Sequence, residues 1–163
     1  MPDTKHILVA VVEDKPGVLT RVASLFRRRG FNIQSLAVGH SEQAGLSRMT
    51  IVVSGDSAVV EQVRKQLDKL INVIRVSNIT EEDLVARELS LIKVKATTST
   101  RSEIIQIVDV FRANVVDVAS DSLTVEVTGD ENKVSSLFEL LRSFGIKEMA
   151  RTGTVALTRG GIS

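Results

Sequence analysis

One turn of the sequence, Glu13-Asp14-Lys15-Pro16-Gly17-Val18-Leu19, has residue types that suit ligand binding. Pro16 lacks an N–H and has a fixed φ, which suits the first turn of a helix, and Gly17 leaves the adjoining backbone without a side chain. Bare amides and the positive end of a helix dipole together attract an anion, by about 0.3–1 kcal/mol at an exposed site. The turn therefore predicts a site for a small carboxylate. The alternative is that Pro-Gly here is only a tight connection between a strand and a helix.

Other residues that could do chemistry are few and scattered. The chain has no cysteine and two histidines, His6 near its start and His40 in a polar loop, and we expect both histidines on the surface. Neither of the glycine-rich motifs that hold nucleotide phosphates is present. The acidic run at 81–83 is typical of a solvated linker. No nucleophile, base and metal ligands converge in the sequence, so it does not support catalysis.

The composition is that of a soluble globular chain. Of 163 residues, 43% are hydrophobic and 25% charged, and the net charge of +1 gives no field that favours nucleic acid. The absence of cysteine fits a reducing compartment. The N-terminus has no signal-peptide pattern and no apolar run approaches the roughly 20 residues that span a bilayer, so we expect neither secretion nor membrane insertion. A cytoplasmic location, or the plastid stroma for a mature plastid chain, follows.

The first half of the sequence alternates strand and helix patterns. The apolar run 7–12 predicts a buried strand, and a 3.6-residue stripe from Val18 to Phe26 predicts a helix that ends at Gly30. Strands follow at 33–39 and 49–53, then a helix striped from Val60 to Leu70 and a strand at 71–79. The order is βαββαβ.

The second half repeats this order after the polar break. A strand at 89–96, a helix striped from Ile104 to Phe111, strands at 115–119 and 123–127, a helix striped from Val134 to Phe144, and one long or interrupted strand at 146–158 are predicted. We infer a duplicated unit and an α+β fold of two tandem ferredoxin-like units, each an antiparallel sheet with both helices on one face and the other face uncovered. The expected domains are 1–80 and 89–163 with a linker at 81–88. Units this small favour an oligomer.

An RNA-binding domain shares this order of elements. Such domains stack bases on aromatic residues of the sheet, but this chain has five Phe and no Tyr or Trp. Four of the five Phe, at 26, 111, 138 and 144, fall on the predicted helices. The sequence therefore excludes that function.

Several strings of the sequence carry a family resemblance. The strings 14–19 and 29–33 resemble the signature of ACT domains, which are βαββαβ modules that bind amino acids. Together with 46–51, 69–73, 87–94 and 153–160, they resemble the small, regulatory subunit of acetohydroxyacid synthase, also called acetolactate synthase, from end to end. The resemblance marks the first domain as an ACT domain.

This resemblance implies a partner protein. In that family a large catalytic subunit carries thiamine diphosphate, magnesium and usually FAD, and the small subunit, without cofactors or catalysis of its own, activates it and confers inhibition by valine or a related amino acid. The resemblance also implies a homodimer through the ACT domains, with the effector at the interface.

The resemblance also implies roles for six residues. The amides of Gly17, Val18 and Leu19 would hold the effector carboxylate, and Leu19 and Ile33 would line the pocket for its side chain. Asp14 and Asn32 would take its ammonium group or bridge to the second chain. Many relatives have Asn where this chain has Asp14, which leaves the identity of the effector open.

The two halves differ at the first helix. Matching Phe26 with Phe111 places Gly17 opposite Ser102, which Arg101 precedes, so the second half lacks Pro-Gly. We expect that half to contact the catalytic subunit or to dimerise rather than to bind the amino acid. A free-standing amino-acid sensor that controls transcription is the alternative, but no helix-turn-helix accompanies the repeats. A small enzyme would need the missing catalytic residues.

Overall fold

A computed structural model describes residues 4–160 of the chain. These residues divide into two compact units. The first contains residues up to Val85 together with residues 154–160, and the second contains residues 86–153. Within the described part of the chain, no helix is both long enough and apolar enough to cross a membrane.

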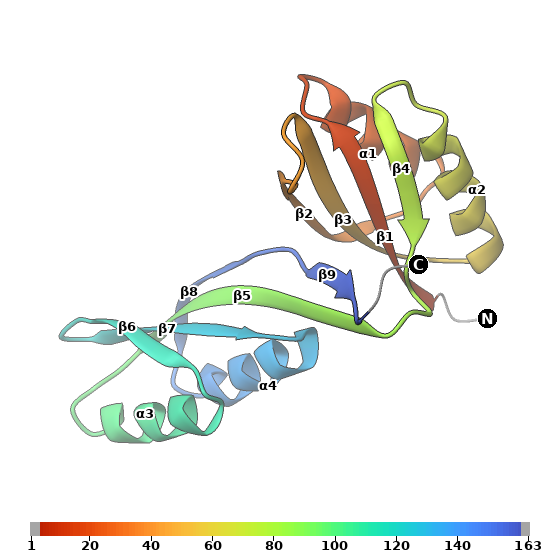
Figure 1. The fold of residues 1–163 in the computed structure, drawn as a ribbon. Helices are drawn as coiled ribbons and strands as arrows, with labels where there is room; N and C mark the ends of the chain where they lie inside the picture. Colours follow the sequence, from red (N-terminus) through yellow and green to blue (C-terminus); the bar gives the residue numbers. More distant parts are fainter. Residues whose placement is uncertain (1–3, 161–163) are drawn as a thin grey trace. The chain divides into compact units, whose positions relative to one another are not determined.

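The first unit is a four-stranded antiparallel sheet with two helices on one face (Figure 1). The strand order is β2-β3-β1-β4. The elements are β1 (Thr4–Glu13), α1 (Val18–Arg28), β2 (Ile33–His40), β3 (Leu46–Gly55), α2 (Ser57–Asp68) and β4 (Val73–Asn78). The predicted βαββαβ order is confirmed.

Alternation along the strands builds the core between this sheet and its helices. Leu8, Ala10 and Val12 of β1 point toward the helices and pack with Val22 and Phe26 of α1. The side chain of Asp56, the N-cap of α2, accepts a hydrogen bond from the backbone N–H of Ala58 and so caps that helix. The helical stripe and the strand period of two therefore meet in one cluster.

The opposite face of the first sheet is also buried, which corrects the expectation that it is left uncovered. Val9 and Val11 of β1 are each only 5% exposed, although they point away from the helices. Their neighbours Thr50 and Val52 on β3 are likewise buried. The residues 154–160 lie in this unit and bond to this face, which no local pattern in the sequence indicates.

The second unit repeats the architecture (Figure 1). Its path of strands is β6-β7-β5-β8, and α3 and α4 lie on one face. The elements are β5 (Leu84–Lys95), α3 (Arg101–Val110), β6 (Asn114–Val118), β7 (Ser122–Gly129), α4 (Glu131–Arg142) and β8 (Ile146–Arg151). Apolar side chains from both helices and from β5 and β7 fill its core: Ile92, Val94, Ile104, Val108, Leu123, Val125, Val134, Leu137 and Leu141.

One boundary differs from the sequence expectation: β5 begins at Leu84, so the second half of the expected linker 81–88 is strand. Of the two forms expected for 146–158, one long strand or an interrupted one, the segment has the interrupted form. β8 ends at Arg151, and β9 (Val155–Thr158) pairs with β5 and groups with the first unit. The compact units thus differ from the expected second domain, 89–163, at its C-terminal end.

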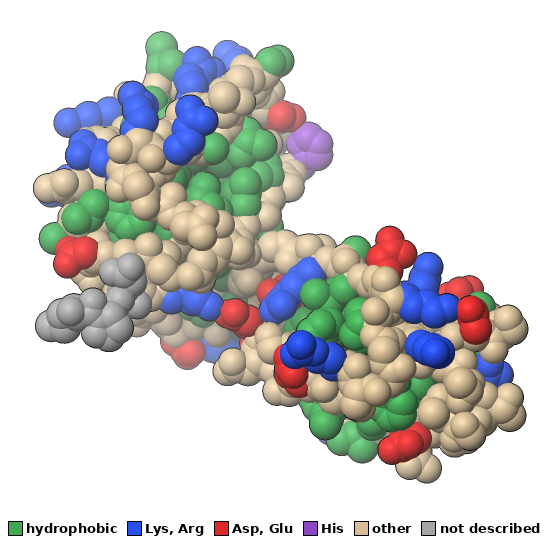
Figure 2. Space-filling view, turned by 180° about the vertical axis from the view of Figure 1, so that it is seen from behind, with side chains coloured by type: hydrophobic (Ala, Val, Ile, Leu, Met, Phe, Trp, Pro, Cys, Tyr) green, Lys and Arg blue, Asp and Glu red, His purple; other side chains and the backbone are tan. Residues whose placement is uncertain are grey.

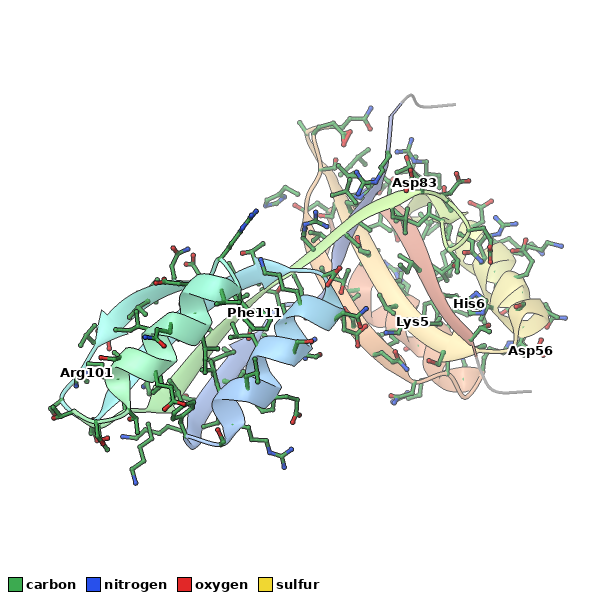
Figure 3. The ribbon with its side chains drawn as sticks, turned by 90° about the horizontal axis from the view of Figure 1, so that it is seen from below. Lys5, His6, Asp56, Asp83, Arg101 and Phe111 are labelled. Atoms are coloured by element: carbon green, nitrogen blue, oxygen red, sulfur yellow. The ribbon has the colours of Figure 1, made fainter. Side chains whose placement is uncertain are left out.

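His6 also differs from expectation, because it is buried within β1 rather than exposed at a ragged end (Figure 3). Its Nε2 lies 2.9 Å from the hydroxyl of Thr4 and 3.2 Å from the carbonyl oxygen of Gly55. The ring therefore serves the packing of the first sheet.

Phe31 fixes the entry to β2. Its ring lies so close to Gly55 that a Cβ on Gly55 would be 1.8 Å from the ring atom Cε1. Only glycine at 55 leaves room for this ring, and the backbone N–H of Phe31 also donates to Phe26 at 3.0 Å. These contacts position Asn32 and Ile33, the residues that follow.

Candidate functional site

The turn before α1 has an open helix N-terminus. Gly17 is the N-cap, with φ 85° and ψ −11°, and it has no side chain to accept a hydrogen bond from the first turn. This left-handed conformation favours glycine, and it keeps Gly17 out of the helix. Pro16 therefore precedes the N-cap. The sequence had indicated instead that Pro16 lies in the first helical turn, and this prediction was wrong.

Backbone hydrogen bonds hold this turn in place from two sides. The N–H of Glu13 donates to the carbonyl of Asn72 at 2.8 Å, and the N–H of Asp14 donates to the carbonyl of Gly45 at 2.9 Å. The Glu13 carboxylate lies 2.9 Å from Lys15 Nζ and accepts from Asn72 at 3.1 Å. Hydrogen bonds from Lys15 and then Asn72 lower the pKa of Glu13. The turn is thus tied to the loops around it.

Two residues outside the predicted site lie beside this turn. His40 Nδ1, at the end of β2, is 3.4 Å from the Asp14 carboxylate. A Cβ built on Gly17 would lie 4.0 Å from Arg21 Nη2, so this guanidinium borders the helix start. Arg21 is four residues after Gly17, a spacing that places both on one helix face and could have indicated it.

Charges of both signs lie at the turn, where Glu13 and Asp14 stand beside Lys15 and Arg21. Arg27, Arg28 and Arg29 at the other end of α1 are exposed, as is Arg21. Figure 2 shows Lys and Arg side chains gathered on the face of the first unit seen there. A carboxylate at the turn would therefore be attracted by Arg21 and Lys15 in particular, and surface charges at the spacing of the other arginines are screened by salt.

Val18 and Leu19 differ in what they offer a ligand. The side chain of Val18 is buried in the core, and its N–H donates to the Lys15 carbonyl at a long 3.4 Å. The side chain of Leu19 is 43% exposed. Leu19 is therefore the residue of this pair whose side chain is free to contact a ligand.

Asn32 and Ile33, the remaining predicted residues, lie at the start of β2, which within one chain is the end far from the turn. His40, beside Asp14, pairs with Ser47, whereas Ile33 pairs with Val53 at the opposite end of the same strands. At about 3.3 Å per residue, β2 separates the two places by roughly 20 Å. The fold thus brings Asp14, Gly17 and Leu19 together, and it places Asn32 and Ile33 elsewhere.

The corresponding turn of the second unit is bridged by its own side chains, although its N-cap side chain, like Gly17, makes no hydrogen bond to the first turn of the helix. Thr100 is the N-cap of α3, so Thr100 and not Ser102 corresponds to Gly17. The match through the two phenylalanines was misplaced because Phe111 follows α3, whereas Phe26 lies within α1. The Thr97 N–H donates to the Thr100 hydroxyl at 2.9 Å. Arg101, at the start of α3 (Figure 3), donates from Nη2 to the carbonyls of residues 119 and 120 at 3.2 and 3.3 Å.

Comparisons with known proteins give a consistent result along the whole chain. A family model described as "AHAS small subunit-like ACT domain" matches residues 8–75, and one described as "Small subunit of acetolactate synthase" matches residues 87–160. A probable acetolactate synthase small subunit of Archaeoglobus fulgidus is 61% identical over 96% of this chain and 98% of its own length. The acetolactate synthase small subunit of Mycolicibacterium smegmatis is 56% identical over 95% and 91%.

A solved structure agrees with these relatives. The crystal structure of an acetolactate synthase small subunit from Thermotoga maritima is 42% identical in sequence. It covers 98% of this chain and 99% of its own, with a TM-score of 0.89. The likeness therefore extends over both units.

Proposed function

We propose that this chain, which belongs to the family of acetolactate synthase small subunits, binds a branched-chain amino acid and thereby regulates the catalytic subunit. Valine is the first candidate for the effector. The observation that supports this proposal is the open start of α1 at Gly17, where no side chain caps the helix. The chain would raise the activity of its partner and make that activity sensitive to feedback inhibition.

The proposal places the reaction on the partner. Thiamine diphosphate, Mg²⁺ and FAD would be held by the catalytic subunit, and this chain would hold none of them. Among residues 4–160, no three His, Cys, Asp or Glu side chains form a group that could hold a metal ion. The chain and its partner would work together in the cytoplasm.

The geometry suggests how the amino acid binds. Its carboxylate would meet the amides at Gly17, Val18 and Leu19, with the guanidinium of Arg21 beside them. Its ammonium group would pair with Asp14, which is exposed and faces His40.

Completion of the pocket requires a second copy of the chain. β2 is an edge strand, and a two-fold axis that pairs two β2 strands antiparallel sets the start of one beside the end of the other. Asn32 and Ile33 of one chain would then lie near Asp14 and Gly17 of its partner. A homodimer through the first units explains why residues at opposite ends of β2 serve one site.

Regulation then follows from differential binding. The effector favours one arrangement of the dimer, and the arrangements differ in how they hold the catalytic subunit. A coupling free energy of about 1–3 kcal/mol produces a 5- to 150-fold effect. We assign effector binding to the first domain, 1–80, and contact with the catalytic subunit to the second, 89–163.

Reconstitution tests this function. The full chain is mixed with a purified acetolactate synthase catalytic subunit, and activity is followed while valine, leucine and isoleucine are titrated separately. We expect the chain to raise activity and one of the three amino acids to lower it again. Calorimetry without the partner should show heat with the same amino acid. Activation without any response to the three would contradict the proposed effector site.

A further inference from the structure

The last described residues, 154–160, form a segment that we call the strap. It begins just after Gly153, where the second unit ends, and it contains β9. Its contacts with Ser35 and Arg48 are made on the face of the first sheet opposite α1 and α2.

Polar contacts hold the strap at three places. The N–H of Thr154 donates to the hydroxyl of Ser35 on β2 at 2.7 Å. Arg48 on β3 donates from Nη2 to the carbonyl of Ala156 at 2.8 Å. The N–H of Arg159 donates to the carbonyl of Asp83 at 2.8 Å, and the two side chains form an ion pair at 3.3 Å near the start of β5 (Figure 3).

Burial supports the same placement. Ala156 is 3% exposed, whereas its neighbours Val155 and Leu157 are 55% and 61% exposed. Ala156 therefore faces the protein and its neighbours face outward, as expected for an extended segment lying on a surface. Burial, followed by repulsion from Arg75, lowers the pKa of Arg48. The bond from Arg48 to Ala156 satisfies a guanidinium that has been taken partly out of water.

The attachment at Ser35 adjoins the proposed effector site. The pairing of β2 with β3 shifts register between Ile33 and Ser35, which marks a bulge or irregularity at Gln34. Ile33 precedes this irregularity and Ser35 follows it. Bulges are common beside functional sites, where they direct a side chain. The strap thus fixes the strand immediately after the residues that would meet the ligand.

We propose that the strap is a regulatory element coupled to effector binding: docked on the first sheet, it holds the start of β2 in the conformation that binds the amino acid. This inference rests on the proposed function. Because the strap continues directly from the second unit, occupancy of the effector site changes the restraint on the point where the chain leaves that unit. Coupling is reciprocal, so the effector must also tighten docking of the strap.

A pair of variants in the strap tests this role in the full-length chain. Ala156→Asp places a carboxylate at the buried position, and Leu157→Asp places the same group at the exposed neighbour. We expect Ala156→Asp to weaken valine binding by at least about fivefold, the lower end of ordinary couplings. Leu157→Asp should bind as the wild type does. Circular dichroism confirms that each variant is folded.

A second, milder pair of variants keeps the proposal testable if Ala156→Asp does not fold. Ser35→Ala removes the acceptor for the Thr154 N–H, and Ser35→Thr keeps a hydroxyl in the same strand. The first should weaken valine binding and the second should restore it. In hydrogen exchange, valine should slow the amides of 154–160 in the wild type and leave them unchanged in Gly17→Asp.

The outcomes separate the two proposals. If the wild type binds valine and the Ala156→Asp and Ser35→Ala variants bind it equally well, the strap has no regulatory role and the proposed function stands. The same conclusion follows if valine does not change the hydrogen-exchange rates of the amides of 154–160. A wild-type chain that binds no branched-chain amino acid contradicts the proposed function and the strap together.

Discussion

The turn before α1 and the turn before α3 occupy equivalent places in two copies of one fold, and neither N-cap side chain bonds the first turn of its helix, yet the two turns themselves are built in opposite ways. At the first turn, left-handed Gly17 leaves the helix uncapped and exposed charges surround it. At the second, threonine and serine hydroxyls bond one another, and Arg101 binds two carbonyls across the unit. The hydroxyl groups of the second turn are occupied by one another. The charged groups of Asp14 and Arg21 beside Gly17 are exposed, so a ligand can reach them.

The largest expected effect comes from removing the second unit while keeping the strap. Leu89 and Thr152 bond to each other through two hydrogen bonds, of 2.9 and 3.0 Å, so an Asn-Gly turn can replace residues 90–151 between them. We expect this chain to bind valine and to lose activation of the catalytic subunit completely. The measurements are calorimetry and the reconstituted activity assay.

This design improves on a chain that ends near Glu82, because such a truncation also removes 154–160 from the first unit. Full activation by the shortened chain would assign the partner contact to the first unit and reverse the division of roles proposed for the two halves.

The next effect concerns Gly17 itself. Gly17→Asp puts a carboxylate where that of the effector belongs, and we expect about 100-fold weaker valine binding, or about 2.8 kcal/mol, with activation retained. Gly17→Asn is the matched control, because it imposes the same left-handed strain at φ 85° without the charge. Undiminished inhibition by valine in the Asp variant, or equal loss in both variants, would contradict the carboxylate site.

A smaller effect distinguishes the arginines at the two helix starts. Arg101→Met removes the donor to two carbonyls, and we expect it to lower the free energy of unfolding by about 1–2 kcal/mol while leaving valine affinity unchanged. Arg21→Met should do the reverse, with several-fold weaker valine binding and nearly unchanged stability. Urea denaturation and calorimetry on the same samples decide the matter. Loss of valine affinity in Arg101→Met would show that the closed turn takes part in binding.

The smallest effect is a dependence of stability on pH in the second unit. A hydrogen bond from Lys147, at 2.7 Å, lowers the pKa of Asp121 below its ordinary value of 3.8. A carboxyl group with a lowered folded pKa stabilises the protein above its unfolded pKa, and this contribution is lost as pH falls through the folded value. Lys147→Met should therefore reduce slightly the fall in thermal stability between about pH 5 and pH 3. If the thermal stability of wild type and variant falls identically with pH, the Asp121–Lys147 pair makes no contribution to the pH dependence.

Much of the fold could be predicted because its signals are local. The apolar run at 7–12, the stripe from Val18 to Phe26 and the alternation at 123–127 each report the periodicity of one element. The repeat of their order gave the two ferredoxin-like units. Boundaries were less accurate, because β5 extends into a segment whose acidic composition resembles a linker.

The candidate site was predictable only in part. Pro16 and Gly17 indicated an open helix start from residue type alone, and the resemblance supplied Asp14, Asn32 and Ile33. Arg21 and His40 border the turn through helix spacing and strand register, which composition does not reveal. His6 became buried because β1 extends to Thr4 and pairs with the end of β3.

The sequence by itself determined the order of elements, the duplication and the contrast between a Pro-Gly turn and one rich in hydroxyl groups, because each depends on neighbours along the chain. Only the tertiary structure decided that Gly17 and Asn32 lie at opposite ends of β2. It also decided that residues 154–160 return to the first sheet. Both are consequences of pairing between segments distant in sequence, and the free energy of such pairing depends on register and burial that local patterns do not encode.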